Sequence, residues 1–220
     1  MKTALVLGAT GLVGSQLVKL LLDTDSFDRV RVLTRRTTGV QHQKLEEIVI
    51  DFDQPEKWAE KVIGDVLFCA FGTTLKKAGN KEAQYKIDYH YQFLVNRLAA
   101  ENGVLDCVIV SSPGASPNSR FFYNRMKGDL DRDVSKLSFD KLRIIQPSVL
   151  AGKREENRGG ERLAIVIGNL LSWIPGIRKY RPISGESVAK AMIQAYNDEN
   201  PMHIVVYGLE KLHQMSKLYK

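Results

Sequence analysis

The sequence predicts an α/β protein with a doubly wound parallel sheet in three α/β/α layers. Three observations support this fold class. Short apolar runs alternate with segments of helical spacing, the first run leads directly into a glycine cluster, and 44% hydrophobic with 26% charged residues over 220 is typical of a globular chain. No repeat or linker divides it, so one domain is expected over residues 1–220.

The first third of the chain begins this alternation. The apolar run Ala4–Leu7 predicts a strand, and apolar residues at helical spacing over Leu12–Leu22 predict a helix. The β-branched runs Val30–Leu33 and Ile48–Ile50 predict two more strands. A further helix is expected to start at Gln54–Glu56, with Pro55 in its first turn.

The middle of the chain continues the pattern. Val66–Cys69 predicts a fourth strand and Val108–Val110 a fifth. Between them, Lys81–Asn102 has helical spacing and stops at Gly103, a residue typical of helix ends.

The rest of the chain is less regular. Ser119–Leu137 predicts a helix and Leu142–Ile145 a sixth strand, whereas Ser184–Tyr196 and His203–Val206 predict a last helix and strand. Residues 150–183 follow no clear period and are expected to form an irregular substrate-side lobe within the domain. Strands that alternate with helices pair in parallel through right-handed crossovers.

Composition excludes several classes of protein. Lys plus Arg is 32 and Asp plus Glu is 25, a net charge of +7, but the basic residues are scattered, so no nucleic-acid partner is expected. Cys69 and Cys107 lie in apolar runs and are expected to be buried free thiols. The longest apolar stretch, Leu163–Ile177, is interrupted and too short for a bilayer. We expect no membrane partner, no metal site and a cytoplasmic location.

The glycine cluster Gly8–Gly14 carries the strongest local signal. It joins a predicted strand to a predicted helix, where glycines allow a sharp turn, a close approach to a pyrophosphate and tight packing of helix on strand. The helix N-terminus offers free N–H donors to the phosphates. The alternative is a tight turn without a ligand. The fold class is therefore Rossmann-like, and the residues expected to contact the cofactor here are Gly8, Thr10, Gly11, Leu12, Val13 and Gly14.

The second strand indicates which nicotinamide cofactor binds. In this fold an acidic residue about 20 positions after the glycines holds the ribose of NAD. Here the chain reads Thr34-Arg35-Arg36, with no carboxylate. A guanidinium group suits a 2′-phosphate, so Arg35, and secondarily Arg36, favour NADP over NAD. The alternative is that both arginines are solvated surface charges.

A serine, a tyrosine and a lysine predict the chemistry. Tyr123 and Lys127 are four apart and share one face of a predicted helix. A nearby ammonium favours the phenolate and makes the tyrosine a usable acid or base, while a serine hydroxyl can bind the substrate oxygen. Ser112 is preferred to Ser111 for that role. A second Tyr-x-x-x-Lys copy, Tyr207 to Lys211, is broken by Gly208 and is not expected to act.

These motifs resemble a known family. Gly-Ala-Thr-Gly-Leu-Val-Gly at 8–14, Phe-Gly-Thr-Thr at 71–74, Val-Ser-Ser at 110–112, and Tyr123 with Lys127-Gly128 occur in the order of the atypical short-chain dehydrogenase/reductases. The subgroup that they resemble includes the Tat-interacting proteins, which bind NADPH. The resemblance implies that Asp88 lies near the active site and that Lys127 also holds the nicotinamide ribose. It further implies cofactor contacts at Asp51, Phe52, Phe71, Gly72, Thr73 and Pro147.

Three functions follow from this resemblance and these residues. The first is an NADP(H)-dependent oxidoreductase that transfers hydride to or from a carbonyl or alcohol, with a small-molecule substrate. The second is an NADP(H)-binding regulatory or redox-sensing interaction protein with little or no turnover, which would bind a protein partner. The third is an isomerase or epimerase that retains its cofactor. A monomer or a homodimer is expected.

Overall fold

A seven-stranded parallel sheet forms the centre of the molecule. The computed structural model describes residues 1–151 and 182–219, so most of the predicted lobe at 150–183 lies outside the described residues. The strand order is β3-β2-β1-β4-β5-β6-β9, which confirms the predicted fold class. The strands are β1 Thr3–Leu7, β2 Arg29–Thr34, β3 Leu45–Val49, β4 Val66–Cys69, β5 Asp106–Val110, β6 Lys141–Ile145 and β9 Ile204–Tyr207.

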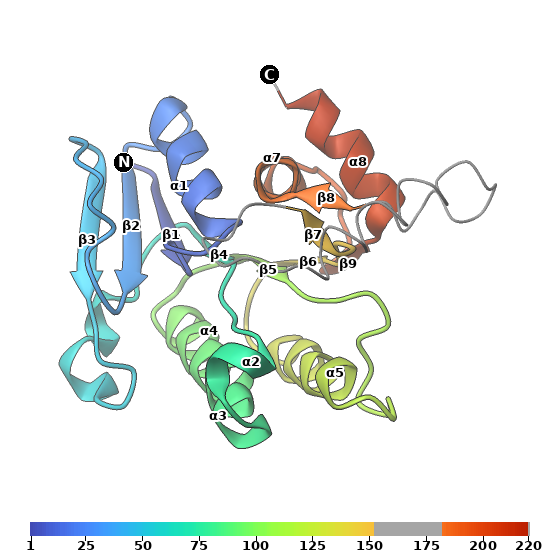
Figure 1. The fold of residues 1–220 in the computed structure, drawn as a ribbon. Coiled ribbons are helices and arrows are strands. Elements are labelled where there is room, and N and C mark those ends of the chain that lie inside the picture. Colours follow the sequence, from blue (N-terminus) through green and yellow to red (C-terminus); the bar gives the residue numbers. More distant parts are fainter. Residues whose placement is uncertain (152–181, 220) are drawn as a thin grey trace.

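Helices cover both faces of this sheet and give three layers (Figure 1). One face carries α1 Gly14–Asp23, α7 Gly185–Tyr196 and α8 Leu209–Leu218. The other face carries α2 Leu75–Ala78, α3 Lys81–Tyr85, α4 Gln92–Glu101 and α5 Phe122–Val134. The helices and the sheet are therefore arranged as the alternation in the sequence predicts.

Each strand contributes to two hydrophobic cores, because successive side chains of a strand point to opposite faces. Along β1, Ala4 and Val6 pack in the core under α1 and α7, whereas Leu5 and Leu7 pack in the core under α4 and α5. All four side chains are fully buried. This two-sided burial explains why the strands read as continuous apolar runs rather than alternating ones.

Several elements differ from the sequence prediction. The predicted helix over Lys81–Asn102 is interrupted by a π-helical turn, η3, at Lys86–Tyr91. The helix expected after Gln54 is two short 3-10 turns, η1 Pro55–Lys57 and η2 Ala59–Lys61. The helices α2 and α8 were not predicted. Neither was a small sheet that pairs β7 Leu150–Ala151 with β8 Ile183–Ser184.

The strand order reverses between β1 and β4. The chain builds outward from β1 to β2 and β3, then returns to add β4, β5, β6 and β9 on the other side. In open parallel sheets, ligands bind beyond the carboxyl ends of the strands at such a reversal. A ligand is therefore expected to bind at the loops after β1 and β4.

Candidate functional site

The loop after β1 is a tight glycine turn. Gly8 has a φ of +95°, and a Cβ there would lie 2.4 Å from the Ala70 carbonyl oxygen that follows β4. A Cβ at Gly14 would lie 2.0 Å from the Gly8 carbonyl oxygen. Side chains at these two positions would fill the turn, so the sequence can form it only with glycine. The helix α1 begins at Gly14, two residues later than predicted. Leu12 and Val13 therefore belong to the turn and not to the helix.

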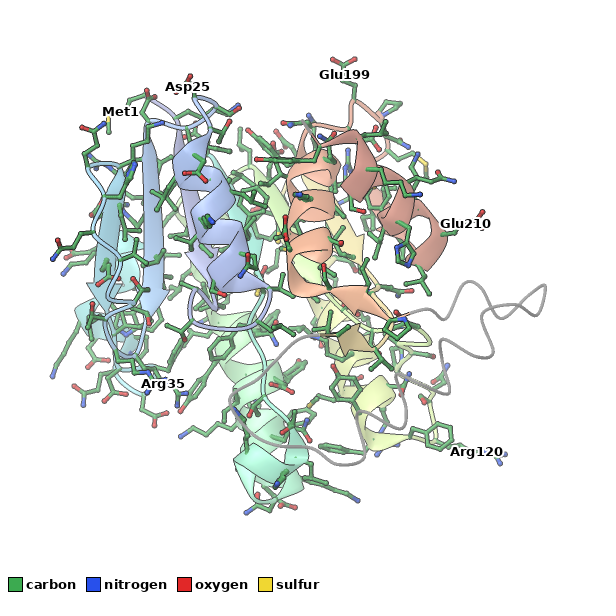
Figure 2. All side chains as sticks on the ribbon, turned by 45° about the horizontal axis from the view of Figure 1, so that its top comes forward. Met1, Asp25, Arg35, Arg120, Glu199 and Glu210 are labelled. Carbon is green, nitrogen blue, oxygen red and sulfur yellow. The ribbon has the colours of Figure 1, made fainter. Side chains whose placement is uncertain are left out.

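A cavity of about 430 Å³ opens beside this turn. Its wall includes the start of the turn, the ends of β2 and β4, and Phe52 after β3. Arg35 and Arg36 also line it, and both are exposed. Figure 2 shows Arg35 just beyond the arrowhead of β2. The structure thus brings together these residues from the predicted cofactor set: Gly8, Thr10, Gly11, Arg35, Arg36, Phe52, Phe71 and Gly72.

Asp51, expected to contact a cofactor, is not among the residues that line this cavity. Its carboxylate instead accepts hydrogen bonds from the Asp53 N–H, at 3.0 Å, and from the Gln54 side chain, at 3.1 Å. The side chain caps its own turn, which is a common use of aspartate. The cofactor contact of Asp51 stays a prediction, whereas the adjacent Phe52 is buried in the cavity wall.

A second cavity, of about 110 Å³, adjoins the first. The two share Gly11, Ala70, Phe71 and Gly72, and we call them together the groove. The second cavity contains residues from the ends of β4 and β5, from η3 and from α5. Its other lining residues are Leu12, Val13, Thr73, Asp88, Val110, Ser111, Tyr123, Lys127 and Leu150.

Helix α5 places the tyrosine and the lysine in the groove. Tyr123 is 42% exposed, whereas Lys127, one turn later, is 4% exposed. The Lys127 ammonium donates to the Val110 carbonyl oxygen at 2.9 Å, which uses one of its three protons. A Cβ at Gly128 would lie 2.2 Å from the Ser116 backbone, so glycine lets α5 pack close to the loop after β5. The predicted pair therefore shares the groove with the glycine turn.

The serine in this groove is Ser111, not Ser112. Ser111 is 4% exposed, lines the groove and donates to the Asp131 carboxylate at 2.5 Å. The Ser112 hydroxyl donates only weakly, at 3.4 Å, to the carbonyl oxygen of the adjacent Pro113. Consecutive side chains at a strand end point in opposite directions, so only one of the two serines can face α5. The geometry revises the preference for Ser112.

Asp88 lies in the groove on the π-helical turn η3, near the site as the resemblance implied. It is 2% exposed, and its carboxylate accepts from the Thr73 N–H at 2.6 Å and from the Gln84 side chain at 3.3 Å. Burial raises the pKa of the Asp88 carboxyl, and the nearby Lys127 ammonium opposes that shift. Isolated π-helical turns are frequent at functional sites.

Asp131 is a site residue that the sequence analysis missed. It lies one turn after Lys127 on α5 and is hydrogen bonded to Ser111. Burial raises the pKa of its carboxyl, while the Ser111 hydrogen bond and the Lys127 ammonium lower it. The only signal in the sequence was its spacing, because 123, 127 and 131 share one helix face.

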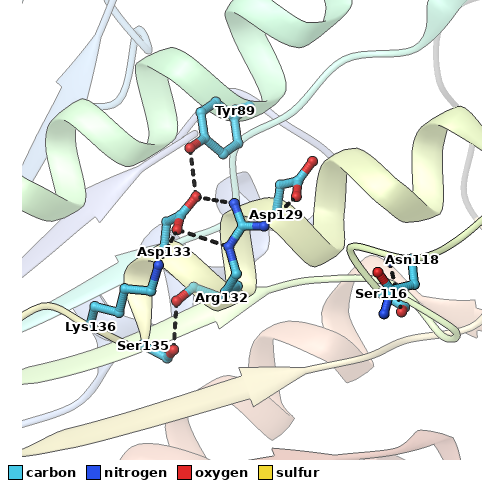
Figure 3. Close-up of polar contacts among 8 residues, drawn as sticks. All are labelled: Tyr89, Ser116, Asn118, Asp129, Arg132, Asp133, Ser135 and Lys136. Carbon is cyan, nitrogen blue, oxygen red and sulfur yellow. Dashed lines mark hydrogen bonds and ion pairs between the residues drawn. The ribbon is translucent and has the colours of Figure 1, made fainter.

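A polar network fixes the far end of α5 (Figure 3). The Tyr89 hydroxyl of η3 donates to Asp133 at 2.8 Å, and Asp133 also pairs with Arg132, at 2.7 Å, and with Lys136, at 2.9 Å. The Arg132 guanidinium is the main cause that holds the pKa of the Asp133 carboxyl far below its usual range. This network ties α5 to the element that carries Asp88.

Two further features lie near the groove. Pro147 is buried and lines none of the cavities described, so its cofactor contact stays a prediction. A third cavity of about 500 Å³ lies between Gln146, after β6, and Lys211, on α8. Tyr207, the first residue of the second Tyr-x-x-x-Lys copy, ends β9, and its hydroxyl donates to Asp198.

Residues 1–151 and 182–219 contain no cluster of three or more His, Cys, Asp or Glu side chains arranged to hold a metal ion. No helix in this part of the chain has the length and apolar character that crossing a membrane requires. Cys69 and Cys107 are buried free thiols, as predicted.

Comparison with known proteins identifies what this chain is similar to. Residues 8–199 match the model of the NAD(P)H-binding family. Protein FMP52, mitochondrial, of Candida albicans is 37% identical over 219 residues, covering 94% of this chain and 95% of the relative. The protein of the same name from Aspergillus niger is 33% identical and covers 91% of each chain. The expectation of a cytoplasmic location is therefore wrong, since relatives that match nearly the whole chain are named mitochondrial.

Solved structures confirm the fold. A UDP-glucose 4-epimerase from Thermotoga maritima superposes with a TM-score of 0.67 at 16% identity, covering 98% of this chain and 82% of the epimerase. The oxidoreductase ylbE from Lactococcus lactis has a TM-score of 0.66 at 19% identity and covers 99% and 98%. At these identities the likeness extends to the fold alone.

Proposed function

The chain belongs to the NAD(P)H-binding family, and from this premise we propose that it is an NADP(H)-dependent oxidoreductase that acts on a carbonyl or alcohol. One observation carries the proposal: a single groove joins the glycine turn to Tyr123, Lys127 and Ser111. A glycine turn that bound no ligand would not explain why a tyrosine, a lysine and a serine line the other end of the same groove.

The residues present fit an adenine dinucleotide. Glycine keeps the turn free of side chains at Gly8 and Gly14, where a Cβ would lie within 2.4 Å of backbone oxygens. Free N–H groups at the start of α1 suit the pyrophosphate. Arg35 and Arg36 place two permanent positive charges at the wider cavity, which supports NADP over NAD.

The protein's own groups supply position and protons. When bound, NADPH supplies the hydride. In this proposal Tyr123 donates a proton to the substrate oxygen in reduction and accepts it in oxidation. Lys127 brings its ammonium charge into the same cavity as Tyr123 and holds the nicotinamide ribose, while Ser111 hydrogen bonds the substrate oxygen.

The test is NADPH oxidation with a panel of aldehydes and ketones, using Tyr123→Phe as the variant. Loss of the acid should lower kcat by roughly 10²- to 10⁴-fold and leave the Kd for NADPH within about twofold. The matched control is Tyr207→Phe, the tyrosine of the second copy, which should keep its kcat. Equal turnover by Tyr123→Phe and the wild type would remove the assigned role. NADPH binding without turnover of any panel member would favour the regulatory function instead.

We also propose that the protein works in mitochondria. The support is that the fungal relatives named mitochondrial match more than nine-tenths of this chain. The full chain with a C-terminal tag, expressed in yeast, should fractionate with mitochondria. Recovery in the cytosolic fraction would contradict this part of the proposal.

A further inference from the structure

Ser111, which lines the groove, is hydrogen bonded to Asp131, a half-buried residue behind it. Ser111 follows β5, and Asp131 lies on the same face of α5 as Tyr123 and Lys127. Only 2.5 Å separates Ser111 Oγ from Asp131 Oδ2. A hydroxyl and a carboxylic acid each carry a proton, so this distance fits donation in either direction. The direction matters, because a serine hydroxyl has one proton to give.

Two carboxyl groups lie near the Lys127 ammonium: Asp88, which is buried in the groove, and Asp131, which is half-buried behind Ser111. Lys127 acts on both Asp88 and Asp131, and burial raises the pKa of each carboxyl. Leaving both ionised would place two negative charges beside one ammonium, with the buried Asp131 Oδ1 unpaired within the described residues, which is costly. This arrangement therefore favours a proton on one of the two carboxyls.

Hydrogen bonding indicates which carboxyl holds that proton. Both oxygens of Asp88 accept from N–H donors, of Thr73 and of Gln84, an arrangement that suits an anion. Asp131 has one partner, the Ser111 hydroxyl. Its Oδ1 is buried and has no hydrogen bond within the part of the chain that the structure describes. An unpaired neutral carbonyl oxygen costs much less than an unpaired carboxylate oxygen.

We propose that Asp131 is a positioning residue that holds a proton on Oδ2 and donates it to Ser111 Oγ. The proton of Ser111 is then free to point into the groove toward an acceptor oxygen, such as that of a carbonyl substrate. Were Asp131 ionised, its carboxylate would accept a hydrogen bond from the Ser111 hydroxyl. Ser111 could then only accept a hydrogen bond from a ligand, such as one donated by an alcohol. The inference rests on the proposed function and deepens it: the neutral pair sets the site for carbonyl reduction.

The first test measures protonation and needs no turnover. Aspartate carboxyl signals of ¹³C-labelled protein are titrated by NMR, and the Asp131 signal is the one lost in Asp131→Asn. It should remain that of a neutral acid at pH 6, where ordinary aspartates are ionised. Ser111→Ala provides a second assignment by shifting the same signal if Asp131→Asn does not fold. An Asp131 signal that titrates near the ordinary aspartate value would overturn the proposal.

The second test measures carbonyl reduction against pH. If the neutral pair is the active form, wild-type kcat/KM should fall about tenfold per pH unit above the Asp131 ionisation. Asp131→Asn, whose amide N–H still donates to Ser111, should lose this fall. The matched control is Asp129→Asn, on the same helix and paired with Arg132, which should behave as the wild type.

The charged group that acts directly on Asp131 is Lys127 on its own helix, with Ser111 facing it from the end of β5 and Asp88 from η3 beyond Lys127. These neighbours are the same in the wild type and in Asp129→Asn. The same pH profile in the wild type and Asp131→Asn would overturn the proposal. Absence of turnover in the wild type would instead count against the proposed function, and the NMR titration would still decide the state of Asp131.

Discussion

At the residue scale, we propose that the two arginines after β2 favour NADP over NAD. Arg35 is exposed at the wider cavity, where a guanidinium can form a charged hydrogen bond with a 2′-phosphate. Removing this charge should not disturb the fold, because an exposed surface charge contributes little to stability. Its effect should therefore appear in ligand binding.

Arg35→Ala should weaken NADPH binding by roughly 1–3 kcal/mol and leave NADH binding nearly unchanged, because only NADPH carries the 2′-phosphate. Calorimetric titration with both nucleotides measures this. Arg97→Ala, which removes a half-exposed arginine from α4, is the matched control and should change neither affinity. Equal losses for NADPH and NADH in Arg35→Ala would count against the 2′-phosphate contact.

The glycine turn gives a second prediction at this scale. Gly14→Ala places a Cβ 2.0 Å from the Gly8 carbonyl oxygen, so the turn or α1 must shift. We expect a loss of roughly 1–3 kcal/mol in the free energy of unfolding and weaker NADPH binding. Urea denaturation and NADPH titration measure the two effects.

The control for that substitution is Gly208→Ala at the start of α8. A Cβ at Gly208 would meet no atom within 4 Å, and its φ is −80°. It should keep both its stability and its affinity for NADPH. Equal losses of stability and NADPH affinity in the two variants would contradict the claim that the close packing at Gly14 requires glycine.

At the scale of elements, α5 carries two of the proposed catalytic residues and is also bound to η3 through its last turn. Its first two turns carry Tyr123 and Lys127, and its last turn carries Asp133, which binds Tyr89 of η3 (Figure 3). Arg132 is the main cause that lowers the pKa of Asp133. A carboxyl whose pKa is lowered by folding stabilises the protein above its unfolded pKa, near 4, and this contribution is lost as the pH falls through the folded value.

Asp133→Asn should therefore lower the free energy of unfolding by about 1 kcal/mol at pH 7. The difference in the free energy of unfolding between variant and wild type should shrink below pH 4, because the wild type then begins to lose the stabilisation that ionised Asp133 provides. Chemical denaturation at pH 7 and at pH 3 measures this. Asp25→Asn, whose side chain is fully exposed, should match the wild type at both pH values. A constant difference between Asp133→Asn and the wild type would contradict this account.

The element boundaries show where sequence reasoning failed. The spacing over Lys81–Asn102 is helical, but a single extra residue per turn at η3 rotates Asp88 into the groove. Two hydrogen bonds of Asp88 stabilise this turn, one with the distant Thr73 and one with the nearby Gln84. The hydrophobic period of the sequence contains no information about either bond. The sequence also did not indicate that Ser111 rather than Ser112 lines the groove, because strand ends are uncertain by a residue and each residue reverses the direction of the side chain.

At the scale of the whole molecule, the sequence predicted the architecture well. Two-sided burial makes strands such as Ala4–Leu7 continuous and apolar, and glycine at Gly8 and Gly14 marks where the first strand turns into the first helix. Those signals are local and strong. The short α2 and the final α8 gave weaker ones, since α2 has only four residues and α8 follows a break at Gly208.

The central claim is that one groove receives NADP(H) and presents Tyr123, Lys127 and Ser111 to the substrate. The most direct measurement is a crystal structure of the protein soaked to saturation with NADP⁺. We predict the pyrophosphate against the glycine turn, the 2′-phosphate beside Arg35 and the nicotinamide ring beside Tyr123. A dinucleotide bound elsewhere, or a nicotinamide ring turned away from Tyr123 in an otherwise occupied groove, would contradict the claim.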